Sequence, residues 1–194
     1  MTREHHRPIR AESEFFEGLE GGHDPAQARA AADLAATVLV RGARATADPG
    51  VAERLQRLAE TEGLETLAEL WSGAPAESLA GCLWRLYVLR SWVYGAPDLA
   101  AEEFSAGRHR SDVARVVAGV PDPPHPDEVR TMIDEVLRGI AEREFADVLF
   151  RAAAFAHVVA VGRARTGHDG AERLLTVAEQ LEAAGHLELA GSLS

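Results

Sequence analysis

Lysine is absent from the sequence, so all 20 basic residues are arginine. This absence excludes a phosphate-binding P-loop, a Schiff-base lysine and an internal pyridoxal-phosphate site, because each of them needs a lysine amine. The single cysteine excludes an internal disulfide and a zinc site built from several cysteines. We therefore expect none of these cofactor or metal chemistries.

Residues that favour strands are also scarce. The chain has 3 isoleucines and 8 threonines against 36 alanines, a balance that favours helix. No apolar run approaches the roughly 18 residues of a membrane span, and no secretory signal opens the chain. The sequence thus predicts a soluble, cytoplasmic, all-α protein that does not contact a membrane.

The composition that remains is typical of a globular protein with an acidic surface. Of 194 residues, 46% are hydrophobic and 26% are charged, and the net charge is −11. This length suits one sizeable core, and the acidic balance argues against nucleic acid as a partner. We expect a flexible tail over 1–23 and a single helical domain over 24–194, with a proline-rich connector at 121–126.

Punctuating residues set the expected helix boundaries. Aspartate followed by proline predicts helix starts at residues 24 and 48, and His168-Asp169 is expected to cap the last helix. Glycines predict interruptions at Gly107 and Gly185. The expected helices cover 24–45, 48–71, 76–95, 98–106, a short stretch from 111, 127–142, 144–165 and 170–184.

Two of these helices are apolar around most of their circumference. Residues 76–95 carry leucines on one side and tryptophans on the other, and residues 144–165 are rich in phenylalanine, valine and alanine. A helix that is apolar all round is typically enclosed by protein. The architecture we predict is a multi-helix bundle with two highly apolar central helices, the second one approached closely by a neighbour over its alanines.

Arg85 and Arg90 interrupt the first of these helices and have two interpretations. In the structural one they pair with carboxylates such as Asp147 or with the carbonyls at helix ends, because an unpaired buried charge is costly. In the functional one they face a pocket for a small anionic ligand, with aromatic walls. The residues of this candidate ligand site are Arg85, Arg90, Trp84, Tyr87, Trp92, Tyr94 and His157.

Motifs for catalysis or metal binding are missing. Cys82 lies among leucines, where a buried structural thiol is the better interpretation. The one Glu-x-x-His pair, Glu20 to His23, falls in a glycine loop and not on a bundle helix. No Gly-x-Ser-x-Gly or Gly-x-Gly-x-x-Gly sequence is present. We assign no catalytic residue, no metal ligand and no cofactor, and the balance is against an enzyme.

Residues 64–90 can be drawn as a helix-turn-helix, as in all-helical repressors of the tetracycline-repressor type. The second helix of such a motif must present polar and basic side chains to the DNA groove. Here that position holds Leu79, Cys82, Leu83 and other apolar residues. Specific DNA binding is therefore not expected.

Two segments, 67–93 (LAELWSGAPAESLAGCLWRLYVLRSWV) and 141–164 (AEREFADVLFRAAAFAHVVAVGRA), resemble a small, uncharacterised all-helical family of high-GC actinobacteria. The resemblance covers roughly 50 residues and includes no chemical motif, so it carries over no activity and no site. It implies a bacterial, cytoplasmic protein with an autonomous helical domain.

Three functions are ordered by these observations. The first is a non-catalytic protein-interaction or regulatory protein, forming a homodimer or binding another protein through its large apolar helix surfaces. The second is a ligand-sensing regulator that uses the aromatic and arginine pocket, with DNA as one target of its regulation. The third is a small all-α enzyme that lacks a recognisable motif.

Overall fold

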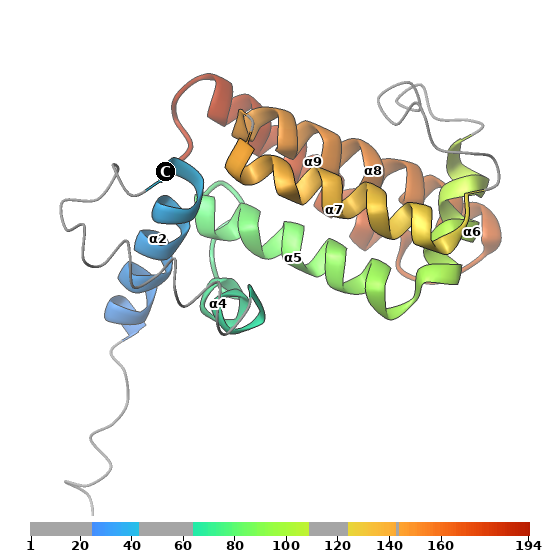
Figure 1. Cartoon of the computed structure of the whole chain (residues 1–194), viewed down its shortest axis with the longest axis horizontal. Coiled ribbons are helices and arrows are strands. Elements are labelled where there is room, and N and C mark those ends of the chain that lie inside the picture. Colours follow the sequence, from blue (N-terminus) through green and yellow to red (C-terminus); the bar gives the residue numbers. More distant parts are fainter. Residues whose placement is uncertain (1–24, 43–63, 109–123, 143) are drawn as a thin grey trace, which may run out of the picture.

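The computed structural model describes residues 25–42, 64–108, 124–142 and 144–194. Within these ranges the regular elements are all α-helices, which confirms the predicted all-α multi-helix bundle. Helices α7, α8 and α9 run along the length of the bundle, with α2 and α4 at one end and α6 at the other (Figure 1). The bounds are α2 Pro25–Arg41, α4 Leu64–Trp71, α5 Leu79–Gly95, α6 Pro97–Arg108, α7 Pro126–Glu142, α8 Phe145–Thr166 and α9 Ala171–Leu189.

Helix α8 is the centre of the fold. It packs most extensively against α9 and α6, and its phenylalanines, valines and alanines are buried almost throughout. By length and composition α8 could cross a membrane, although the sequence shows no uninterrupted apolar run because Asp147 and Arg151 divide it. Since 72% of its apolar stretch is buried inside the protein, α8 has the surroundings of a core helix in a soluble protein.

The second predicted central helix, α5, is buried on one side only. Its leucines face the core, whereas Val88 and Tyr94 on the other side are each 39% exposed. Among the described helices, only α8 has the character expected of both. The prediction of two central helices was wrong in this respect, because apolar residues around a helix do not show whether neighbours cover every side.

Glycines bring the backbones of α6 and α8 into contact. A Cβ added to Gly162 would lie 1.7 Å from the carbonyl oxygen of Glu103, and one added to Gly107 would lie 1.9 Å from the carbonyl oxygen of Val158. Gly107 is therefore a packing residue inside α6, and the helix break predicted there was wrong. The helix tolerates this glycine because close packing offsets its low helix propensity.

The start and end of α9 also differ from the prediction. Its N-cap is Gly170, with φ of +88°, and His168 and Asp169 do not cap the helix. The helix continues past Gly185 to Leu189, because Gly185 faces the ring of Phe150 at a place where a Cβ would lie 2.8 Å from the ring. Both glycines are required, one for its positive φ and the other for a close approach.

The segment after α9 returns to the far end of the bundle. Leu193 is buried, and the carbonyl oxygen of Ser194 accepts a hydrogen bond of 2.9 Å from the amide of Leu79. The carboxylate of Glu188 accepts two hydrogen bonds from the Arg41 guanidinium. These contacts join α2, the start of α5 and the end of α9.

Several predicted features lie outside the described residues. They are the tail over 1–23, the first part of the helix predicted from residue 48, the short helix predicted from residue 111 and residues 121–123 of the proline-rich connector. In the described remainder of the connector Pro124 is buried, and Pro126 begins α7.

Candidate functional site

Helix α5 begins at a well-formed cap. The side chain of Ser78 accepts a hydrogen bond of 3.0 Å from the amide of Gly81, one of the first-turn N–H groups that a helix leaves without a partner. A Cβ on Gly81 would lie 1.7 Å from the carbonyl oxygen of Pro75, so only glycine fits beneath the incoming loop. The cap and this close approach fix the direction in which α5 leaves the loop.

The two faces of α5 are both apolar but differ in exposure. The inner face, which includes Leu83, Leu86 and Leu89, belongs to the core. The opposite face is exposed or partly exposed, and the rings of Trp84 and Tyr87 stack on it with their centroids 5.9 Å apart. This outer face of α5 comprises Trp84, Tyr87, Val88, Ser91, Tyr94 and Gly95.

No acidic residue occurs anywhere in α5. Each of the other six described helices has at least one aspartate or glutamate, in a chain whose net charge is −11. The charges of α5 are Arg85 and Arg90, which lie at the two edges of the outer face, because at 3.6 residues per turn they project to opposite sides of Trp84. The outer face is therefore an uncharged aromatic strip on an acidic molecule.

Arg85 makes structural contacts with neutral oxygens. Its Nε donates to Oε1 of Gln180 on α9 at 2.6 Å, and a terminal nitrogen donates to the carbonyl oxygen of Gly81 at 2.8 Å. Partial burial lowers the pKa of the Arg85 guanidinium below its ordinary value. The carboxylate named in the prediction, Asp147, instead lies 4.0 Å from Arg151 on its own helix.

Arg90 is neutralised within the protein. Its Nε donates to the carboxylate of Asp134 on α7 at 3.0 Å, and its guanidinium carbon lies 4.1 Å from the ring centroid of Tyr94. The Tyr94 hydroxyl donates to the other carboxylate oxygen of Asp134, and this hydrogen bond raises the pKa of Tyr94. Asp134 thus holds both side chains against α7.

Trp92 contacts a buried ionic cluster that the sequence analysis did not find. The guanidinium of Arg163 lies 4.9 Å from the Trp92 ring centroid, a cation–π contact. The Arg163 Nε lies 2.9 and 3.0 Å from the two carboxylate oxygens of Glu103, which is fully buried. A buried carboxylate needs such partners, because its desolvation is otherwise costly.

His168 completes this cluster at the turn between α8 and α9. Its Nδ1 lies 3.0 Å from Oε1 of Glu103 and 3.0 Å from the hydroxyl of Thr166. The Thr166 hydroxyl donates to the carbonyl oxygen of Arg163, so its proton is already used within the turn. These contacts account for His168 as an orienting residue of the turn.

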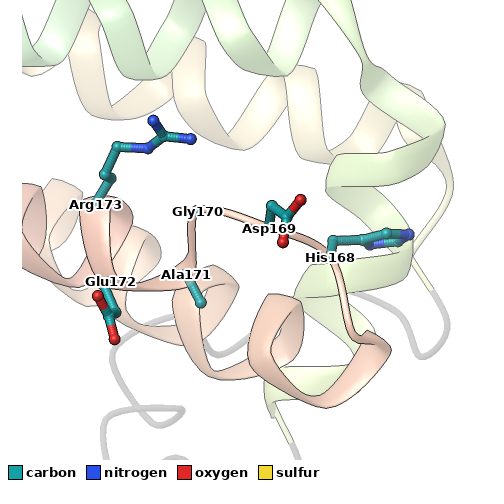
Figure 2. Close-up of a pocket in the computed structure, with 6 residues that line it drawn as sticks. All are labelled: His168, Asp169, Gly170, Ala171, Glu172 and Arg173. Carbon is teal, nitrogen blue, oxygen red and sulfur yellow. The ribbon is translucent and has the colours of Figure 1, made fainter.

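An open hollow of about 490 Å³ adjoins this turn and is lined by residues 168–173. Figure 2 shows His168 directed toward α6, and Glu172 and Arg173 pointing to opposite sides of α9. Asp169, Glu172 and Arg173 are all exposed at its rim. Because the rim mixes both signs of charge, its electrostatics favour neither an anionic nor a cationic ligand.

His157 lines a second hollow, of about 300 Å³, between α8 and α9. Ala153, Ala154 and Ala178 form its apolar wall, and Glu179 and Glu182 supply carboxylates. An anionic ligand would meet these carboxylates at close range, so the charge of this hollow is opposite to that of the predicted site.

The structure distributes the seven predicted ligand-site residues over separate surroundings. Arg85 contacts α9, Arg90 and Tyr94 contact α7, and Trp92 contacts Arg163. Trp84 and Tyr87 stack on each other, and His157 lies apart on α8. The aromatic residues therefore share the outer part of one helix and do not surround a common cavity with both arginines.

Cys82 is fully buried in the core cluster, as the sequence predicts. Its thiol lies 3.6 Å from the carbonyl oxygen of Ala76, and burial raises its pKa to about 12. The thiolate that would react is therefore strongly disfavoured. Within the described ranges, no three His, Cys, Asp or Glu side chains gather as a group that could hold a metal.

One sequence pattern does point to the buried cluster. Glu103 lies on the apolar side of α6 together with Ala100, Phe104 and Gly107, all of which are buried. A carboxylate at the spacing of a buried stripe indicates either a partner or a site. No pattern in the chain identifies that partner as Arg163, because the two residues are 60 positions apart.

No protein-family model, curated protein or solved structure matches the chain. The geometry described above therefore carries the functional argument.

Proposed function

We propose that this is a non-catalytic interaction protein of a regulatory kind, which binds a protein partner through the outer face of α5. The observation that carries the proposal is the uncharged strip of Trp84, Tyr87, Val88 and Tyr94 on an otherwise acidic molecule. Tryptophan and tyrosine supply large contact areas and dominate the binding energy of many protein interfaces. Arginine, which is enriched at the same interfaces, borders the strip on both sides.

The ligand-sensing alternative has weaker support. The residues chosen for it contact four different parts of the protein, and the hollow beside His157 carries carboxylates. A pocket for an anion would bring Arg85 and Arg90 together, whereas each is already hydrogen-bonded on its own side of α5. An interaction surface needs neither arginine to be free.

Burial at the start of α5 also argues against DNA as the partner. A recognition helix inserts its N-terminal residues into the major groove. In α5 these residues, among them Leu79, Ala80 and Leu83, are buried in the core. The proposal therefore places the protein in the bacterial cytoplasm, as the sequence predicts, with a protein and not a nucleic acid as its partner.

A photo-cross-linking residue at position 88 tests the proposal on the full chain. With benzoylphenylalanine replacing Val88, we expect a discrete cross-linked product in cells, which disappears when Trp84→Glu is added. The matched control places the same group at Leu189, which is 71% exposed on α9. A product that forms equally from both positions, or from neither, would refute the proposed function.

A further inference from the structure

Gly95 is a helical glycine for which the protein's own packing gives no reason. At Gly81, Gly107, Gly162 and Gly185 an added Cβ would lie within 3 Å of another atom, whereas at Gly95 it would meet nothing within 4 Å. Nor does Gly95 have a positive φ. Glycine in a helix costs about 0.5–1 kcal/mol relative to alanine. The absence of a side chain at this exposed position is accounted for by something that approaches from outside.

Large and small residues alternate symmetrically along the same row of α5. Trp84, Val88, Ser91 and Gly95 follow the spacing of one helix face. Trp84 and Gly95 are equally distant from the midpoint between residues 89 and 90, and so are Val88 and Ser91. An antiparallel copy of this row, related by a two-fold axis through that midpoint, would place each large side chain opposite a small one.

Resting on the interaction function proposed above, we infer that the partner is a second copy of this chain. The two α5 helices pack antiparallel, with Trp84 of each copy over Gly95 of the other and Val88 against Ser91. Both copies present the same patch, as a two-fold interface requires. Large side chains then fill the space that the small ones leave, which is how helix surfaces pack.

The charges of the molecule also favour a second copy. A two-fold axis brings each residue near its own counterpart, so a charged central row would repel itself. The row on α5 is uncharged, and the Arg90 beside it is neutralised by Asp134. With a net charge of −11, two copies repel each other over most of their surfaces. Contact through α5, which has no carboxylate, keeps that repulsion small.

The area of one helix predicts a moderate affinity. Stable interfaces bury about 800 Å² on each partner, and a helix of 17 residues is only about 25 Å long. The outer face of α5 therefore supplies a small interface. We expect a dimer that dissociates in the micromolar range, which matches a reversible regulatory contact better than a permanent one.

Sedimentation velocity of the purified full chain over a range of concentrations tests the dimer. We expect reversible dimerisation that weakens at least tenfold in Gly95→Leu and in Val88→Glu. Neither change adds an internal clash, so circular dichroism and urea unfolding should show an intact fold. The matched control, Leu189→Glu on α9, should dimerise as the unmodified chain does. A chain that stays monomeric at every concentration, or a dimer broken only by Leu189→Glu, overturns the inference.

Disulfide formation tests the antiparallel register. In a Cys82→Ala background, one sample carries Val88→Cys and another carries Ser91→Cys. When the two are mixed and oxidised, the antiparallel pairing predicts mainly the mixed disulfide, because residue 88 faces residue 91 across the axis. Predominance of the two homodisulfides would overturn the register.

The cross-linking experiment separates this inference from the proposed function. If the group at position 88 captures a different protein while the purified chain remains monomeric, the second copy is wrong and the interaction function stands. If position 88 gives no product and the chain is monomeric, both are wrong.

Discussion

Helices α5 and α8 have similar sequences and different surroundings. Both are rich in leucine, valine, alanine and aromatic residues, and both contain two or more arginines. Helix α8 is enclosed by neighbours that approach to backbone contact at Gly162, whereas α5 is covered on its inner face and exposed on its outer face. An apolar helix is thus either a core element or an interface, and its composition alone does not distinguish the two.

Glycine position makes the same distinction at the level of single residues. Gly162 of α8 is enclosed by α6, and Gly95 of α5 faces open space. In both helices the missing side chain marks a surface that another helix approaches. For α8 that helix is part of the same chain, and for α5 we propose that it belongs to a second copy.

Removal of the buried carboxylate should have the largest effect on stability. Glu103→Gln leaves Arg163 with its charge uncompensated in a largely buried position, so we expect a loss of about 3–5 kcal/mol. Chemical unfolding in urea measures this change. The neighbouring Glu102→Gln, at an exposed position, should change stability by less than about 0.5 kcal/mol. Equal effects of the two substitutions would contradict the role given to Glu103.

Paired glycine substitutions compare the two helices directly. Gly162→Ala places a methyl group 1.7 Å from the Glu103 carbonyl oxygen, so α6 and α8 must separate at a cost of about 3 kcal/mol. Gly95→Ala should instead stabilise the dilute monomer by about 0.5–1 kcal/mol, since it meets nothing. If both substitutions move the urea midpoint in the same direction, the contrast between α5 and α8 is wrong.

Loss of Arg85 should have an intermediate effect. Arg85→Ala removes two hydrogen bonds to neutral oxygens, for which we expect about 1–2 kcal/mol and a lower melting temperature. A double-mutant cycle with Gln180→Ala isolates the contact between α5 and α9. A melting temperature that is unchanged or higher would show that Arg85 does not have this structural role.

The buried thiol predicts the smallest effect, and one that depends on pH. Cys82 has its pKa raised from 9.0 to about 12 in the folded protein, so the folded state retains its proton where the unfolded state loses it. The stabilisation is complete below pH 9 and is lost as pH rises toward 12, which gives about 1 kcal/mol less stability at pH 10 than at pH 8. Cys82→Ala should remove this part of the pH dependence. An unchanged slope would argue against the burial of the thiol.

The sequence predicted the class of fold and most helix positions, because apolar periodicity reflects burial directly. It failed at Gly107 and Gly185, where local propensity favours an end and close packing favours continuation. The exposure of Val88 and the pairing of Glu103 with Arg163 were not predictable. Both depend on which helix lies beside which, and such neighbours are set by tertiary packing and not by spacing along one helix.

The contact between the Ser194 carbonyl and the Leu79 amide has a consequence for folding during synthesis. Helices α6, α8 and α9 can associate through neighbours that emerge soon after one another. The first turn of α5 and its link to α2 depend on residues made more than a hundred positions later, and contacts of such long sequence separation form slowly. A ribosome-bound chain that has not yet exposed Ser194 would therefore hold its core together while the end that carries α2 is still incomplete. Until then, the aromatic strip would belong to a helix that is anchored at one end only.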